Sequence, residues 1–395
     1  MKKLIIILVL IISVAMLGFA ASEEVQVYAY LYNAAPTHAG QLDILQNMVE
    51  SRLTGAGEFY ASVLRKLLAE YKTIRDVTER NAADEQAMLL SALLGAEKYT
   101  QAAADLWLVV DTFSAPLVKA EALMALGKIR ATNYLPQVIR VLESVNTAPT
   151  TDRLNGERIA FGAIISLEKY QDPSGYLPVY FASTGWYSDR IKSQAVKSLP
   201  LISQDPTPYM MEVVKGAGYD YNAKYNALRS IEASKASNQD KVGIAVAALA
   251  EGWRSATNDA QLRSILSNMR KMSISMINRY KTDDESIYPL LERCYTQGVD
   301  VQEKLDAIAA LASQGTDESA RRLAKFLADL NDKRRINNIR PEDEQMVRAI
   351  IPALGQTGRS NVVEGRAALT AVSASNWTPA IERLAETEIR RLYRR

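Results

Sequence analysis

The stretch that decides the fold is residues 115–146, APLVKAEALMALGKIRATNYLPQVIRVLESVN. Its first half places apolar and small side chains on one helical face, at Leu117, Ala120, Leu123, Met124 and Gly127. After the turn RATNYLP, in which Pro136 suits the start of a helix, a second apolar stripe follows at Val138, Ile139, Val141 and Leu142. Two short helices of this kind cannot bury their stripes alone, so the unit requires similar units beside it.

Similar units follow along the chain. Variants of the motif A-x-x-A-L end at Leu94, Leu126, Leu167, Leu199, Ile231, Leu266, Leu311 and Leu354. The intervals are 32, 41, 32, 32, 35, 45 and 43 residues, and periods of this size in a helical chain indicate stacked helix pairs. No linker rich in Pro, Ser or Gly interrupts them, so the sequence predicts one continuous all-α solenoid over residues 41–375. The arginine-rich end of residues 376–395 suits a helix C-terminus and predicts a capping helix that starts at Asn376.

The starts of several first helices share a chemistry. An aspartate precedes a lysine by three or four residues at Asp189–Lys192, Asp220–Lys224 and Asp300–Lys304. This pattern, with pairs such as Val118-Lys119 before A-x-x-A-L-G, resembles the HEAT-repeat family, whose first helix carries an aspartate near its start and then a V-R-like pair. The resemblance covers about residues 84–372 and is clearest over residues 115–142. It implies a right-handed α-solenoid of about eight HEAT-like helix pairs.

The first residues predict export. Lys2 and Lys3 precede an apolar run, and small residues end at Ala20, which is the pattern of a secretory signal peptide over residues 1–20. The alternative is an uncleaved membrane anchor, because residues 4–21 carry no charge and are just long enough to span a bilayer. Cys294 is the only cysteine, and avoidance of thiols fits an exported protein, periplasmic or secreted, of a bacterial envelope.

The next segment, residues 21–40, differs from the helical repeats. Val25 and Val27, and then Ala29 and Leu31, alternate as in a strand. Because no second strand is present to pair with this one, the sequence predicts an extended N-terminal arm.

Enzyme and cofactor chemistry has little basis in this sequence. His38 is the only histidine, so a Cys/His zinc site is excluded and a Ser-His-Asp triad is disfavoured. No phosphate-binding or dinucleotide-binding motif follows a strand. Asp283-Asp284-Glu285 could touch a hard cation, but the EF-hand spacing is absent and a solvated loop is the simpler interpretation. We therefore expect no enzyme activity, no cofactor and no metal; carboxylates that converge only in the fold are the enzymatic alternative.

Charge gives no indication of a nucleic-acid partner, because without Lys2 and Lys3 the chain has 45 basic and 45 acidic residues. Four lysines at equivalent repeat positions could still form a basic row for an acidic partner: Lys119, Lys192, Lys224 and Lys304. The structural interpretation is that each aspartate caps its helix and pairs with a nearby lysine, at roughly 0.2–0.5 kcal/mol per pair. We adopt the structural interpretation.

Aromatic side chains supply the candidate binding residues. Phe113, Trp186, Tyr219 and Trp253 lie 12 or 13 positions before the reference residues of their units, which places them in equivalent turns along one edge. Because Tyr and Trp offer large amphipathic surfaces, the candidate partner-binding residues at this edge are Trp186, Tyr187, Tyr219, Tyr221 and Trp253. The alternative is that each ring seals the seam between neighbouring units.

These patterns favour a non-enzymatic, exported HEAT-repeat scaffold that binds an unidentified protein along its concave surface. The second hypothesis is a carbohydrate-binding or cell-wall-binding module that grips sugar rings with the aromatic edge. Contact with a membrane is expected only if the N-terminal segment stays uncleaved. Exposed coplanar rings would favour sugar binding, whereas an apolar groove with a polar rim would favour protein binding.

The export prediction has a direct test. Mass spectrometry of the exported protein should find Ala21 as the new N-terminus, because the small residues before it suit cleavage. Recovery of intact Met1 from a membrane pellet would establish the uncleaved anchor instead.

Overall fold

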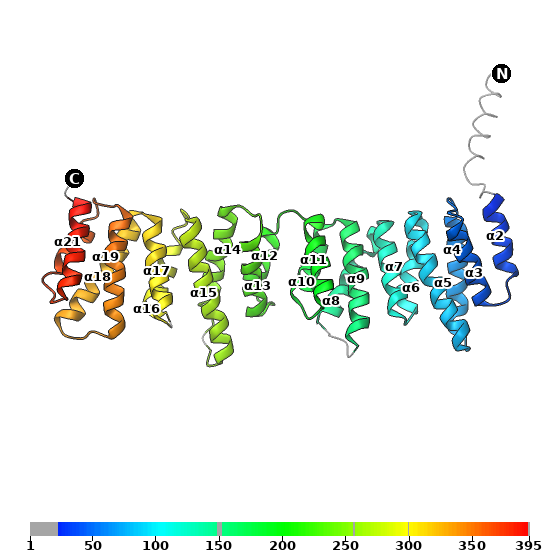
Figure 1. Cartoon of the computed structure of the whole chain (residues 1–395), viewed down its shortest axis with the longest axis horizontal. Helices are drawn as coiled ribbons and strands as arrows, with labels where there is room; N and C mark the ends of the chain where they lie inside the picture. Colours follow the sequence, from blue (N-terminus) through cyan, green and yellow to red (C-terminus); the bar gives the residue numbers. More distant parts are fainter. Residues whose placement is uncertain (1–22, 148–151, 256, 299, 394–395) are drawn as a thin grey trace, which may run out of the picture. The chain divides into compact units, whose positions relative to one another are not determined.

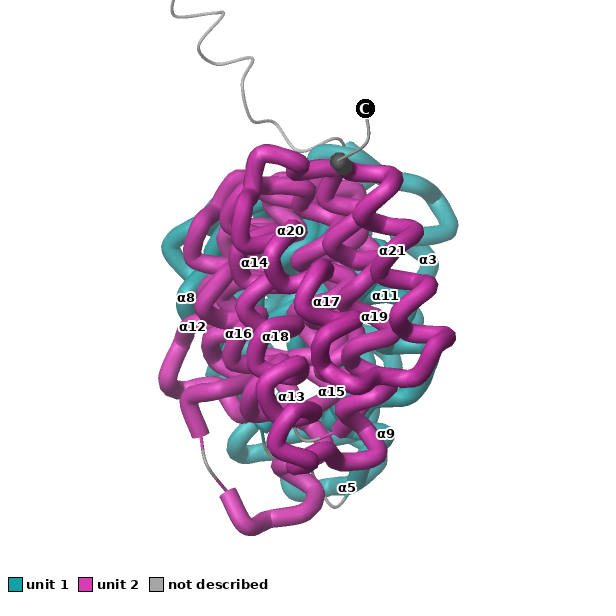
Figure 2. Tube along the Cα trace, turned by 90° about the vertical axis from the view of Figure 1, so that its left-hand side faces the viewer, with its two compact units in different colours: residues 1–204 teal, residues 205–395 magenta. Residues whose placement is uncertain are grey.

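The regular elements of the computed structural model are all helices over the residues that the structure describes, which confirms the all-α class. The structure describes residues 23–393 except 148–151, 256 and 299. The predicted signal peptide, residues 1–20, therefore lies outside the described residues. The chain divides between Gln204 and Asp205 into two compact units (Figure 2), where the sequence predicts one continuous repeat region over residues 41–375.

Unit 1, up to Gln204, holds the first ten described α-helices. Their bounds are α2 Glu23–Ala34, α3 His38–Glu50, α4 Gly57–Glu70, α5 Val77–Ala96, α6 Ala103–Thr112, α7 Pro116–Lys128, α8 Leu135–Thr147, α9 Arg153–Tyr170, α10 Tyr176–Thr184 and α11 Asp189–Ile202. Short 3-10 helices precede α5, α6, α8 and α10.

Unit 2, from Asp205, continues the series to α21. The bounds are α12 Thr207–Lys215, α13 Tyr221–Ala233, α14 Asn238–Glu251, α15 Ala260–Tyr280, α16 Ile287–Gln297, α17 Val301–Gln314, α18 Asp317–Arg335, α19 Pro341–Thr357, α20 Val363–Ala371 and α21 Pro379–Tyr393.

The helices of each unit alternate between two layers (Figure 1). In unit 1, α3, α5, α7 and α9 each contact the next odd-numbered helix, up to α11, while α4 contacts α6 and α8 contacts α10. In unit 2 the odd-numbered helices α13 to α21 and the even-numbered helices α12 to α20 do the same. The eight reference positions of the sequence alignment fall one on each odd-numbered helix from α5 to α19. Each unit is therefore a stack of helix pairs, as the periods predict.

The register of the alignment holds at all but one reference position. The reference residues of α5, α7, α9, α13, α15, α17 and α19 are 0–3% exposed. In α11, Leu199 is half-buried and Ser198 is buried in its place. The buried residues of this helix, Ala195, Ser198 and Ile202, are spaced by three and four, so its inward face lies one residue before the predicted one.

The backbones of α7 and α9 are in direct contact at two glycines, as the small-residue face of α7 predicts. A methyl group added at Gly127 would lie 2.5 Å from Cα of Ser166, and one added at Gly162 would lie 2.5 Å from the carbonyl oxygen of Ala120. No side chain larger than hydrogen fits at either glycine. The two absent Cβ atoms therefore set the spacing of α7 and α9.

The predicted extended N-terminal arm over residues 21–40 is wrong. Helix α2 covers Glu23–Ala34, and α3 begins at His38. Val25 and Tyr32 are its buried residues, and their spacing of seven is helical. The Tyr32 hydroxyl donates a 2.8 Å hydrogen bond to Oε1 of Gln86, which ties α2 to α5 and makes these residues part of unit 1.

The C-terminal helix α21 is present, but its predicted start at Asn376 is wrong. It begins at Pro379, three residues later. Asn376 has a positive φ of 56°, and its carbonyl oxygen accepts a 2.9 Å hydrogen bond from Nε of Arg334. Asn376 therefore forms the turn before the helix.

The glycine contacts predict an asymmetric response to added methyl groups. Gly127→Ala and Gly162→Ala should each destabilise unit 1 by about 1–3 kcal/mol, because the backbones must separate. Gly243→Ala is the matched control, since a methyl group there meets nothing within 4 Å, and it should stabilise its helix by roughly 0.5–1 kcal/mol. Urea unfolding measures all three. Equal effects of all three substitutions would contradict the close α7–α9 packing.

Candidate functional site

An apolar groove crosses the odd-numbered layer of unit 1, over α5, α7, α9 and α11. It encloses about 370 Å³, within the usual range of binding pockets. The apolar side chains that line it are Met88, Leu117, Met124, Leu154, Phe161 and Ile191. Leu117 and Leu154 are 49% and 57% exposed, so two leucines present apolar surface to solvent here.

One register, repeated in two neighbouring helices, builds the groove. The second, fifth, sixth and ninth residues of α7 line it, and so do the same four positions of α9. These residues are Leu117, Ala120, Glu121 and Met124 in α7, and Leu154, Glu157, Arg158 and Phe161 in α9. Spacings of three, four and seven put four side chains on one face of each helix. Because α7 and α9 pack closely, the two faces form one surface.

The acidic side chains at the rim already have partners within unit 1. Glu121 forms an ion pair of 3.5 Å with Lys128. Glu157 accepts hydrogen bonds from the backbone N and Oγ of Ser188, at 2.7 and 2.8 Å. These two carboxylates therefore hold α7 and the start of α11 in place.

The basic side chains at the rim are Arg158 and Arg190. Arg158 donates a 3.2 Å hydrogen bond to the side-chain oxygen of Asn155. The guanidinium of Arg190, the second residue of α11, lies 5.8 Å from the ring centre of Phe161. Neither arginine forms an ion pair with any residue that the structure describes. Two positive charges at the rim are thus available to a partner.

Of the predicted aromatic residues in unit 1, Trp186 and Tyr187 seal the contact between neighbouring repeats. Trp186 donates from Nε1 to the carbonyl oxygen of Val145 at 3.1 Å, and the Tyr187 hydroxyl donates to Oδ1 of Asn146 at 2.7 Å. The two rings stack with centres 4.2 Å apart, and Tyr187 is only 3% exposed. This geometry favours the seam interpretation for both residues.

In unit 2, Tyr219 and Tyr221 flank the helix cap of α13 and are both half-buried. Asp220 between them accepts a 2.7 Å hydrogen bond from the backbone N of Ala223. The Tyr221 ring lies 5.4 Å from Nζ of Lys224. Both tyrosines keep part of their surface exposed, so a role in binding stays a prediction for them.

Trp253, the last predicted aromatic residue, covers a buried charge cluster in unit 2. The guanidinium groups of Arg270 and Arg293 lie 4.2 and 4.7 Å from its ring centre. Arg270 is itself buried and binds both carboxylate oxygens of Glu303, at 2.6 and 3.1 Å. Trp253 also donates from Nε1 to Sγ of Cys294 at 3.4 Å. These contacts favour a structural role for Trp253.

The single cysteine of the chain, Cys294, lies beside Trp253 in this cluster. Cys294 is fully buried, and this burial raises the pKa of its thiol to about 12. An unfolded thiol ionises near pH ~8.5, so the folded chain keeps a proton that the unfolded chain loses above that pH. The contribution of Cys294 to stability therefore falls as the pH rises from the unfolded pKa toward the folded one.

The four lysines of the predicted basic row have different surroundings. Lys224 is buried and pairs with Glu251 at 2.6 Å, whereas the other three are half-exposed. Asp220 and Asp300 cap α13 and α17 with their side chains, as the structural ladder predicts. For α11 the N-cap residue is Ser188 instead of the expected Asp189.

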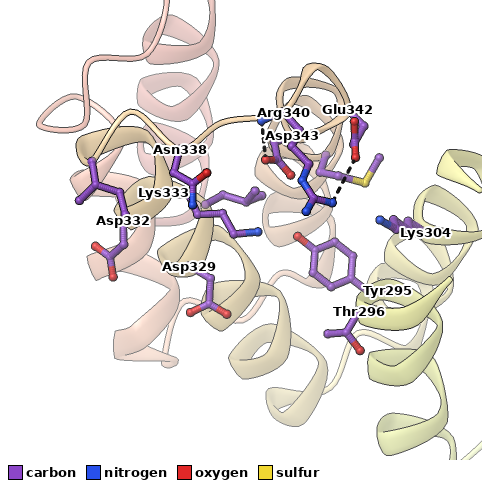
Figure 3. Close-up of a pocket in the computed structure, with 13 residues that line it drawn as sticks. Tyr295, Thr296, Lys304, Asp329, Asp332, Lys333, Asn338, Arg340, Glu342 and Asp343 are labelled. Carbon is purple, nitrogen blue, oxygen red and sulfur yellow. Dashed lines mark hydrogen bonds and ion pairs between the residues drawn. The ribbon is translucent and has the colours of Figure 1, made fainter.

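A second hollow, of about 700 Å³, lies in unit 2 between α16, α17, α18 and the start of α19 (Figure 3). Charged side chains dominate it: Lys304, Asp329, Asp332, Lys333, Arg340, Glu342 and Asp343. Sequence reasoning missed this site, because its lining comes from segments spread over some fifty residues. Only Lys304 among them was a candidate, as a member of the basic row.

No family model matches the chain, and no curated protein matches it. Among the residues that the structure describes, no helix is both long and apolar enough to cross a membrane. Over the same residues, no group of three or more His, Cys, Asp or Glu side chains could hold a metal ion.

The Trp253 cluster makes a testable prediction. At pH 8 the native chain should react with a thiol reagent far more slowly than the urea-unfolded chain, because Cys294 is buried and protonated. Trp253→Ala should speed this labelling and lower stability by about 3 kcal/mol. Tyr30→Ala, at a side chain 74% exposed in unit 1, is the control and should change neither. Equal labelling of native and unfolded chains would contradict the buried thiol.

Proposed function

We propose that this chain is an exported, non-enzymatic helical-repeat protein of HEAT type that binds another protein. The binding surface in this proposal is the apolar groove of unit 1. The observation that carries the proposal is the groove itself, in which exposed apolar side chains of α7 and α9 are bordered by charged side chains. An apolar centre with a polar rim is the composition of protein interfaces.

The groove suits an amphipathic helix or helix-like segment of the partner. Such a segment inserts apolar side chains at positions i, i+3 or i+4, and i+7 into a groove between helices. The guanidinium groups of Arg158 and Arg190, which form no ion pair with a described residue, favour acidic residues beside that apolar stripe, because complementary charge steers and orients the partner. We therefore propose an acidic, amphipathic segment as the ligand of the groove.

The alternative, a sugar-binding aromatic edge, has less support. Trp186 and Trp253 already contact stacked rings, guanidinium groups and hydrogen-bond acceptors of their own unit, and Tyr187 is buried. Sugar binding would depend on Tyr219 and Tyr221 alone. We therefore retain protein binding as the proposal.

The test is capture of the partner by the mature chain, residues 21–395, from its own envelope fraction. The groove variant combines Leu117→Ser and Leu154→Ser. The matched control combines Leu108→Ser and Leu201→Ser, which are equally exposed leucines outside the groove. All four side chains are about half exposed, so melting temperatures should stay close to that of the unchanged chain.

The groove variant should capture at least about tenfold less of the partner, because central apolar anchors commonly contribute ~2 kcal/mol or more each. The control variant should capture as much as the unchanged chain, and quantitative mass spectrometry compares the three. Arg190→Gln should weaken capture further at low salt and less at high salt. Equal capture by groove and control variants would overturn the groove as the binding surface.

A further inference from the structure

The charged hollow of unit 2 is a separate site, and its cations point inward. Lys333 comes from the last turn of α18, Lys304 from the first turn of α17, and Arg340 from the N-cap of α19. Figure 3 shows Lys304 and Lys333 directed toward Tyr295 from opposite sides, with Arg340 above its hydroxyl group. Positive side chains from α17, α18 and the N-cap of α19 therefore surround Tyr295 in the hollow.

Most carboxylates of the hollow are engaged locally. Asp343 accepts a 2.9 Å hydrogen bond from the backbone N of Arg340 as part of a capping box. Glu342 lies 3.8 Å from the Arg340 guanidinium, and Asp332 pairs with Arg335 at 3.0 Å. These carboxylates fix the start of α19 and the end of α18, so they are less available to neutralise the two lysines.

Lys304 and Lys333 form no ion pair with any residue that the structure describes. Asp329 lies one turn before Lys333 on α18, yet the two do not come within ion-pair distance. Lys304 also lies in the first turn of α17, where the helix dipole disfavours a cation. Lys304 is half-buried and Lys333 is exposed, so a bound anion can reach both ammonium groups. An anion there would offset the unfavourable interaction of Lys304 with the helix dipole.

Tyr295 supplies a neutral donor at the same point. Its ring stacks on Phe326, with centres 3.9 Å apart and planes at 17°. Burial, with Asp343 and Asp329 nearby, raises the pKa of Tyr295 well above its usual value, so the hydroxyl keeps its proton. Tyr295 is half-buried, and its hydroxyl has no hydrogen-bond partner among the described residues, so the hydroxyl can donate to a ligand.

We propose that this hollow binds the carboxylate or phosphate group of a ligand, held by Lys304, Lys333, Arg340 and the hydroxyl of Tyr295. Cationic side chains and a phenol hydroxyl form charge-assisted hydrogen bonds with such oxygen anions. A free peptide C-terminus and a phosphorylated envelope component both carry this chemistry. The site is built within unit 2 alone, so it does not depend on the groove proposed for protein binding.

Calorimetric titration of residues 21–395 with three probes tests the proposal and separates the two sources. The probes are inorganic phosphate, an N-acetylated tripeptide with a free C-terminal carboxylate, and the same tripeptide as its amide. Phosphate, the free-acid peptide or both should bind, whereas the amide should not. Tighter binding of phosphate assigns a phosphorylated ligand, and tighter binding of the free acid assigns a peptide C-terminus. Absence of binding by both anions would overturn the proposal.

Variants locate the binding. Lys304→Gln should weaken it about tenfold or more, the loss expected for one hydrogen bond between charged groups. Tyr295→Phe keeps the stack on Phe326 and should weaken binding several-fold, whereas Asp329→Asn should strengthen it by removing a competing anion. Lys235→Gln is the control, because this exposed lysine lies outside the hollow and changes the net charge equally. If Lys235→Gln weakens binding as much as Lys304→Gln, the binding is non-specific and the site is overturned.

Discussion

The close packing of α7 against α9 is the constraint on which the proposed binding surface of unit 1 depends. Gly127 and Gly162 leave no room for a Cβ atom between the two backbones, and interior packing tolerates such added volume poorly. At this spacing, the second, fifth, sixth and ninth residues of α7 lie beside the residues at the same positions of α9, on one continuous surface. Side chains that would be separate exposed residues on distant helices therefore become one groove, with Leu117 and Leu154 at equivalent helical positions.

Unit 2 contains two deeply buried ion pairs. Lys224 with Glu251, and Arg270 with Glu303, are ion pairs of 2.6 Å with nearly no exposure. Charges buried in this way are tolerated only when paired, and removal of one partner is strongly destabilising. Trp253 covers one of these pairs, which explains why an aromatic residue at a repeat turn has a structural role. In the charged hollow of the same unit, Lys304 is half-buried and Lys333 is exposed, and neither forms an ion pair with a residue that the structure describes.

Much of the fold follows from local pattern. The helix pairs, their alternation and the buried reference residues can be predicted because a helical stripe of small and apolar residues must be covered. The prediction of an extended N-terminal arm failed because the alternation at Val25 and Val27 competes with the helical spacing of Val25 and Tyr32. The burial of Val25 and Tyr32 and the hydrogen bond from Tyr32 to Gln86 of α5 favour the helix. A local pattern also could not show that the chain divides into two compact units between Gln204 and Asp205.

The two proposed binding surfaces were harder to predict from the sequence than the fold. With the structure known, the groove corresponds to apolar residues at the second and ninth positions of α7 and α9. The sequence alone does not show that Leu117 is exposed while Leu123 is buried. The buried state of Tyr187 depends on Asn146, forty-one residues away. The hollow around Tyr295 joins side chains from three helices and a capping box, and only the folded chain brings them together.

Site-specific photo-crosslinking in the producing cell tests the central claim of partner binding most directly. A photoreactive side chain replaces Leu117, Leu154 or, as the comparison, Leu108 on α6, one position at a time. The account predicts that positions 117 and 154 crosslink to the same partner protein while position 108 does not. Crosslinking of that partner from position 108 but from neither groove position would contradict the account.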